Sequence, residues 1–167
     1  MINITEGDLL YHAVHGLCRV VEIDKQKEAG KETLSYSLVP KAAGRMKTRF
    51  IIGAAGMEES GFHTLASLKE ANKILGYLKK PASTLVGQNQ AWDFAKTIRL
   101  FSHEKFEAKD QRKRQQLERS VRGLVGEFSL IFKISLKETA TRIQKSLGSA
   151  PRVNPAVLVA IEQAGED

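Results

Sequence analysis

Two histidines near the N-terminus are the first residues whose type and spacing could support chemistry. His12 and His15 lie three residues apart, and Cys18 follows three residues further on, so that the three could be considered as ligands of a metal ion. Zinc sites use four such ligands, usually from paired cysteines or an HExxH helix, whereas this chain has one cysteine and neither motif. We therefore expect His15, which precedes Gly16, to be a turn residue.

Other patterns that support catalysis are missing from the sequence. The glycines do not follow the GxxxxGK[ST] or GxGxxG spacing of phosphate-binding loops, and no serine lies in a nucleophile elbow. Glu58 and Glu59 alone cannot assemble a metal-dependent hydrolytic site. The single cysteine cannot form an internal disulfide, and Cys18 lies in an apolar run that is typical of a buried strand. We expect a protein that is not an enzyme and that uses neither a cofactor nor a metal.

Charge is distributed unevenly along the chain. Residues 1–66 carry eight Lys or Arg and eight Asp or Glu, residues 67–150 carry seventeen and eight, and residues 151–167 carry one and three. The net charge of +7 therefore comes from the middle segment. A basic segment attracts polyanions, whereas a neutral one gains nothing from a phosphate backbone and is better suited to a protein partner. A well-solvated helical surface would explain the same excess without any partner.

The first 60 or so residues predict strands. Ala29-Gly30 and Ala43-Gly44 lie between apolar stretches, where hairpin turns are expected. A segment of this length and pattern predicts a small, strongly bent antiparallel sheet or barrel. The expected strands are Leu9–Tyr11, Leu17–Ile23, Thr33–Val39 and Met46–Ile52.

The remainder of the chain predicts helices. Ser67 with Glu70, and Ser135 with Glu138, have the spacing of a capping box, and Asn154 precedes a proline as a helix cap often does. The expected helices are Leu68–Lys80, Gln90–Phe101, a long helix with an apolar face from Leu117 to Phe132, one that starts after Ser135 and ends at Gly148, and Ala156–Gln163, ended by Gly165.

Together these patterns predict an α+β protein with a β domain at residues 1–66, a basic helical domain at 67–150 and a short C-terminal helix or tail at 151–167. No apolar run approaches the roughly 18 residues that span a membrane, and Met1–Gly16 has neither a basic start nor an apolar signal core. We expect a cytoplasmic protein without membrane contact, acting as a monomer.

The segment Gly7–Val20, which reads GDLLYHAVHGLCRV, resembles the opening of the CarD/CdnL family of bacterial RNA polymerase-binding transcription regulators. In that family a Gly-Asp pair, two apolar residues and a tyrosine precede a His-Gly turn, in which we expect Gly16 to adopt a positive φ. His12 stands where the family usually has a proline. Met46–Ile52 is similar to a later strand of the family, with Arg49 where a basic residue contacts polymerase.

The resemblance continues through the helical half in the same order. Gln90-Ala91-Trp92 lies where the family has a helix-borne tryptophan, Val121–Leu124 resembles its Val-Arg-Asp-Leu helix, and Ile134-Ser135 with Glu138 resembles its Leu-Ser-x-x-Glu helix start. Phe94 and Thr97 depart from the family, which tends to have basic residues there.

The resemblance implies an N-terminal Tudor-like β-barrel that binds the RNA polymerase β subunit, and a C-terminal helical domain that touches promoter DNA at the upstream edge of the bubble. In the family the tryptophan wedges into the minor groove and slows collapse of the open complex, without reading sequence. The implied polymerase-binding residues are Arg19, Lys47 and Arg49, and the implied DNA-binding residues are Trp92, Lys96 and Arg99.

Several alternatives stay open at this point. Trp92 could pack between helices with Phe94 and Phe101 instead of meeting DNA. A polymerase- or repair-associated adaptor without direct DNA binding would also suit the two-part charge distribution, and a metal-dependent enzyme is a third interpretation. The basic cluster Lys109, Arg112, Lys113 and Arg114 is either a DNA contact or a solvated helix face.

Overall fold

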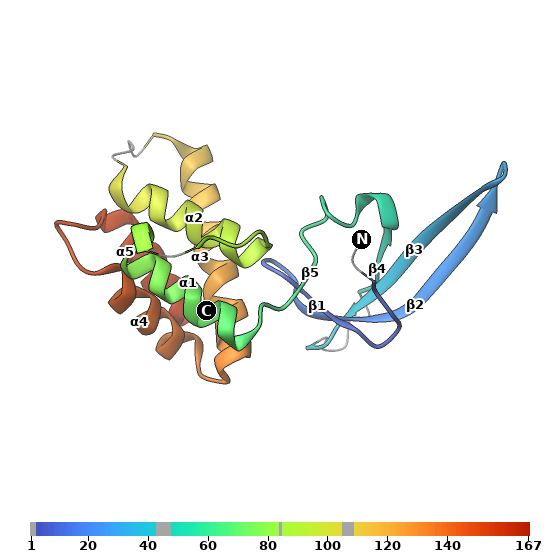
Figure 1. Ribbon diagram of the computed structural model, residues 1–167, viewed down its shortest axis with the longest axis horizontal. Coiled ribbons are helices and arrows are strands. Elements are labelled where there is room, and N and C mark those ends of the chain that lie inside the picture. The colour runs from blue at the N-terminus through green and yellow to red at the C-terminus, as the bar shows by residue number, and fades with distance from the viewer. Residues whose placement is uncertain (1–2, 43–47, 84, 105–108) are drawn as a thin grey trace. The chain divides into compact units, whose positions relative to one another are not determined.

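The computed structural model describes residues 3–42, 48–83, 85–104 and 109–167 (Figure 1). The chain divides into two compact units, Met1–Leu65 and Ala66–Asp167. The first, called the sheet unit, contains an antiparallel sheet, and the second, called the helical unit, contains five helices. The predicted α+β class is confirmed.

The sheet unit has five strands in the order β4-β3-β2-β1-β5. The strands β4 and β5 form the two edges, and no pairing between them is seen in the described residues, so the sheet is open there. Closure into a Tudor-like barrel stays a prediction. The bounds are β1 Leu9–His12, β2 Gly16–Glu28, β3 Lys31–Pro40, β4 Phe50–Gly53 and β5 His63–Thr64.

Side-chain alternation gives the sheet one buried face. Cys18 and Val20 of β2 pack with Leu38 of β3 in the core. A bulge at Val21 shifts the register by one residue, so that Ile23 again packs on the core side. Burial raises the pKa of the Cys18 thiol, because the charged thiolate is disfavoured away from water.

The strands β2 and β3 form a long hairpin whose tip contains two residues with positive φ. Ala29 has φ 49° and Gly30 has φ 81°, the combination that a type I′ turn needs. The turn lies where the sequence predicts it. Ala43-Gly44, the second expected turn, and the start of the expected strand at Met46 lie outside the described residues.

Replacing Ala29 by asparagine is expected to stabilise the sheet unit by about 0.5–1 kcal/mol. An alanine side chain disfavours positive φ, whereas asparagine tolerates it and is the preferred first residue of an Asn-Gly turn. Urea unfolding of the full chain, followed by amide exchange in the hairpin, measures the change. Ala29→Val is the control and should destabilise; an unchanged or lower stability of Ala29→Asn would contradict this explanation.

The described part of the helical unit contains five α-helices, and three of their caps follow the predicted signals, whereas Asn89 and Asp110 cap α2 and α3 without having been predicted. Ser67 and Ser135 each complete a capping box with the glutamate three residues later, and Asn154 caps the helix that begins at Pro155. The bounds are α1 Leu68–Lys79, α2 Gln90–His103, α3 Gln111–Phe132, α4 Leu136–Leu147 and α5 Pro155–Glu166. None of the described helices is long and apolar enough to cross a membrane.

Two glycines allow close helix packing around α3 and α4. A Cβ at Gly123 on α3 would lie 2.5 Å from the Phe94 ring, and one at Gly165 on α5 would lie 2.8 Å from Ala140 on α4. The prediction that Gly165 ends the last helix is wrong, because α5 continues to Glu166 and the glycine serves the contact with α4. The residues after Pro151 therefore pack into the helical unit through α5.

Candidate interaction surfaces

The face of the sheet opposite the core is the first candidate surface. Because Cys18 and Val20 point into the core, Arg19 between them points to the other side. On β4, Ile51 alternates in the same way between two core-side residues and is 70% exposed. This surface, called the outer sheet face, consists of Arg19, Glu22, Arg49 and Ile51.

Arg49 is held on the outer sheet face by an ion pair. Its Nη2 contacts Glu22 Oε2 on β2, and both side chains are about half exposed. An exposed pair of this kind contributes little to stability, because water and salt screen it. Arg19 lies on the same face, whereas Lys47, the third expected polymerase contact, lies outside the described residues. The structure thus places two of the three expected residues on one surface.

The strand β4 adds a second property to this surface. Among the described residues β4 pairs with β3 alone, so that its other side presents backbone N–H and C=O groups at a sheet edge. Such an edge can accept a further strand from a partner protein. Exposed Ile51 on β4 supplies an apolar contact beside it.

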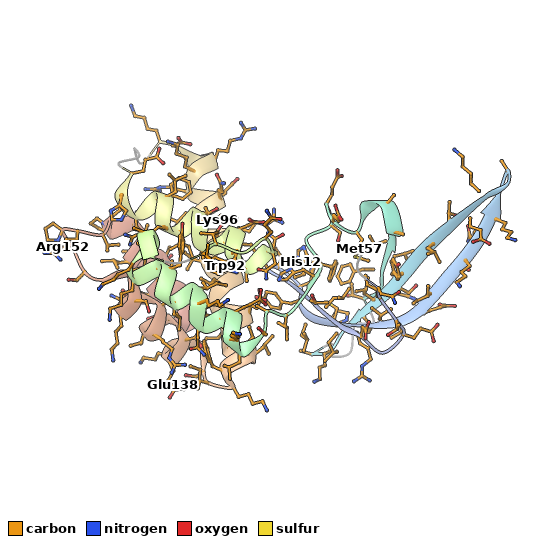
Figure 2. All side chains as sticks on the ribbon, in the orientation of Figure 1. His12, Met57, Trp92, Lys96, Glu138 and Arg152 are labelled. Carbon is orange, nitrogen blue, oxygen red and sulfur yellow. The ribbon has the colours of Figure 1, made fainter. Side chains whose placement is uncertain are left out.

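In the helical unit, Trp92 is a core residue. It is 1% exposed, and its ring meets Tyr77 of α1 edge-on with centroids 5.6 Å apart. The indole also lies directly under Gly87, where an added Cβ would come within 2.4 Å of its Nε1 atom. Figure 2 shows Trp92 among the helices, with Lys96 further along α2. The alternative of a packed tryptophan fits this placement.

Lys96 and Arg99 are engaged within the helical unit. Lys96 Nζ lies 3.2 Å from Asp93 Oδ1, and Arg99 Nη1 donates a 2.9 Å hydrogen bond to the Leu78 carbonyl of α1. One stripe of α2 does contain Trp92, Lys96 and Arg99. Contacts with α1 occupy both ends of this stripe, through the rings at one end and the Arg99 hydrogen bond at the other. A DNA-facing stripe with a minor-groove wedge does not fit this arrangement, because the indole would first have to leave the core.

The basic cluster before and within the start of α3 is partly neutralised. Lys113 Nζ lies 2.5 Å from Glu104 Oε1, and the hydrogen bond to this carboxylate raises the pKa of Lys113. Asp110 lies 4.0 Å from the same amine and caps α3. Arg112 and Arg114 are exposed.

The outward face of α4 is a basic surface that the sequence reasoning missed. It lines a shallow depression of about 570 Å³. The Arg142 guanidinium lies 4.5 Å from the centroid of the Phe132 ring, which fixes it by a cation–π contact. The helical spacing of the cations in the sequence could have revealed this face, since they lie on the side of α4 opposite the buried Ala140 and Ile143. This surface, called the α4 cationic face, consists of Lys137, Arg142 and Lys145.

Among the described residues that line this depression Glu138 is the acidic one, and its charge serves the helix cap. Its Oε2 accepts hydrogen bonds from the Ser135 backbone N–H at 3.0 Å and from the Ser135 hydroxyl at 2.9 Å. The backbone bond, followed by the hydroxyl bond, lowers the pKa of Glu138 below its ordinary value of 4.5. The carboxylate is therefore fixed at the start of α4.

The Glu138→Gln protein is expected to be less stable than wild type at neutral pH. In acid, the two proteins should become equally stable. Because the folded state lowers the pKa of Glu138, its contribution is present above the ordinary value of 4.5 and disappears as the pH falls through the lower folded value. Thermal unfolding of both proteins between neutral pH and pH of about 3 measures the difference. A difference in melting temperature that stays constant across this pH range would contradict the stabilising role of the Glu138 carboxylate. Glu162→Gln on exposed α5 surface is the control.

His12 and His15 build the turn between β1 and β2. The His12 Nδ1 atom accepts hydrogen bonds from the backbone N–H groups of Val14 at 3.0 Å and His15 at 3.2 Å, and the two rings stack with centroids 4.5 Å apart. Gly16 has φ 69°, which confirms the predicted positive φ. Among the described residues no group of three or more His, Cys, Asp or Glu side chains could hold a metal ion.

No family model matches the chain, and no curated protein sequence matches it.

Proposed function

We propose that this protein is a transcription regulator that binds the RNA polymerase β subunit through its sheet unit and stabilises the open promoter complex through its helical unit. The observation that supports this most is the division of charge between two compact units. The sheet unit carries eight basic and eight acidic residues, whereas the helical unit carries eighteen and eleven. The ordered resemblance to CarD/CdnL regulators supplies the identity of the partners.

On the sheet unit, the outer sheet face is the proposed polymerase contact. It combines two arginines, an exposed apolar side chain and the edge of β4, so that a strand of the β subunit can add to the sheet while Arg19 and Arg49 meet acidic groups. A Tudor-like barrel is the finer fold that this proposal includes.

On the helical unit, the α4 cationic face is the proposed contact with upstream DNA. Lys137 and Lys145 are two helical turns apart, about 12 Å along the axis, with Arg142 beside them. Cations spaced in this way can contact successive phosphates without touching base edges, and such contacts carry no sequence information. Promoter choice would then come from the polymerase.

Stabilisation of the open complex requires only a difference in affinity. If the protein binds the open complex more tightly than the closed one, this difference is the whole effect on the equilibrium. A few phosphate contacts are expected to supply about 1–3 kcal/mol, or roughly 5- to 150-fold. Attachment through the sheet unit raises the local concentration, so that weak contacts with DNA suffice.

The lifetime of a polymerase–promoter open complex tests this function. The wild-type protein should lengthen the lifetime, and Lys137→Glu/Lys145→Glu should lose most of this effect while still binding polymerase. Arg112→Glu/Arg114→Glu makes the same charge change on α3 and should keep it. If the α4 variant retains the full effect, the adaptor without direct DNA binding becomes the better explanation.

A further inference from the structure

Gly76 lies in the middle of α1 without a packing reason. Glycine weakens a helix, and Gly123 and Gly165 are explained by close contacts with neighbouring helices. A Cβ at Gly76, in contrast, would meet none of the described residues within 4 Å, and the residue is exposed. No described residue of the helical unit therefore fills the space above Gly76.

Two lysines lie on the same side of α1 as Gly76, together with exposed Asn72, whose Nδ2 donates a 3.0 Å hydrogen bond to the Leu68 carbonyl. Lys69, Lys73 and Gly76 stand at i, i+4 and i+7, which places them on one stripe opposite the buried Ala71 and Leu78. Both lysines are exposed. This surface, called the glycine stripe, consists of Lys69, Lys73 and Gly76.

The acidic neighbour of the glycine stripe is already engaged. Glu70 Oε2 accepts a hydrogen bond from the Ser67 backbone N–H at 3.2 Å, and its Oε1 accepts one from Asn89 Nδ2 at 3.0 Å. The carboxylate is thus held at the start of α1, toward α2, and the stripe itself carries only positive charge.

We propose that the glycine stripe binds the sugar–phosphate backbone of DNA, with Gly76 as the point of closest approach. The inference rests on the proposed function, and it adds a second contact on α1, a helix that packs beside α4 (Figure 1). A missing side chain lets a phosphate approach the helix backbone while Lys73 neutralises it. A protein partner fits less well, because the centres of protein interfaces are apolar and poor in lysine, and the stripe has no apolar side chain.

Replacement of Gly76 separates a binding role from a structural one. Gly76→Ala and Gly76→Gln should both raise the melting temperature of the helical unit, by roughly 4–8 °C, since each residue favours a helix more than glycine does. Gly76→Gln should nevertheless weaken binding of the full chain to a fluorescein-labelled DNA duplex roughly three- to tenfold, as its side chain fills the open space. For Gly76→Gln we therefore expect a higher melting temperature together with a lower affinity for the duplex.

The lysines supply a matched pair of variants. Lys73→Gln removes a charge from the glycine stripe, and Lys109→Gln removes the same charge from an exposed residue before α3. The slope of log affinity against log salt concentration should become shallower by about 0.9 for Lys73→Gln and stay unchanged for Lys109→Gln.

Three results would overturn the inference. Equal duplex affinity of wild type and Gly76→Gln would remove the stripe from the DNA contact and leave the proposed function in place, provided that the α4 variant still loses binding. Weaker binding of Gly76→Gln to polymerase, with unchanged duplex affinity, would assign the stripe to a protein. No duplex binding by the wild-type protein, alone or with polymerase, would overturn both proposals.

Discussion

Trp92→Ala is expected to destabilise the helical unit by about 3–5 kcal/mol. The indole is one of the largest fully buried side chains in the described part of the protein, and it fills the space between Tyr77 on α1 and Gly87. Removing a buried aromatic ring costs its transfer free energy and leaves a cavity that the neighbours fill only in part. This cost is a large share of the 5–15 kcal/mol that stabilises a typical domain.

Urea unfolding followed by helical circular dichroism measures this effect, because the variant lacks the only tryptophan as a fluorescent probe. Leu85→Ala is the control, since Leu85 is 93% exposed and should change stability by less than about 0.5 kcal/mol. A Trp92→Ala protein as stable as wild type, but unable to lengthen the open complex, would instead support the wedge that the family resemblance implies. The measurement therefore distinguishes a core residue from a DNA-inserting one.

Glu127→Ala is expected to cost about 2–4 kcal/mol. Glu127 on α3 is fully buried, and its Oε1 accepts a 2.9 Å hydrogen bond from the backbone N–H of Ala66, the first residue of the helical unit. Removal of the carboxylate leaves that amide without its acceptor, which costs about 1–3 kcal/mol, and a cavity adds to the loss.

Glu127→Gln keeps an oxygen acceptor at the same place and should cost clearly less. Glu118→Ala on exposed α3 surface controls for the loss of a negative charge. The unfolding free energies of the three variants, with hydrogen exchange of the Ala66 amide, report the effect. If Glu127→Ala unfolds at the same urea concentration as wild type, the carboxylate does not hold the start of the helical unit.

Local signals made most of the elements predictable. The capping boxes at Ser67 and Ser135 depend on residues three apart, and the Ala29-Gly30 turn depends on two adjacent residues. Such signals need no information from elsewhere in the chain. They therefore predict element existence well. The predicted and observed ends differ by at most three residues for four helices, whereas α3 begins at Gln111, six residues before the apolar face at Leu117.

Features that depend on distant segments were not predictable. The strand β5 has two residues and exists because it pairs with β1, which no local periodicity reveals. Gly165 has the sequence position of a helix stop, but its contact with Ala140 on α4 is tertiary. The spacing of Trp92 and Lys96 identifies a stripe on α2, whereas the segments that cover Trp92 come from α1 and the loop before α2.

Binding of the intact protein to RNA polymerase and to a DNA duplex tests the division into two partner surfaces most directly. Arg49→Glu places two acidic groups together on the outer sheet face and should weaken polymerase binding tenfold or more, by roughly 1.4 kcal/mol, without changing duplex affinity. Lys137→Glu/Lys145→Glu should do the reverse. Loss of the same partner in both variants, or no polymerase binding by the wild-type protein, would contradict the assignment of the sheet unit to polymerase and the helical unit to DNA.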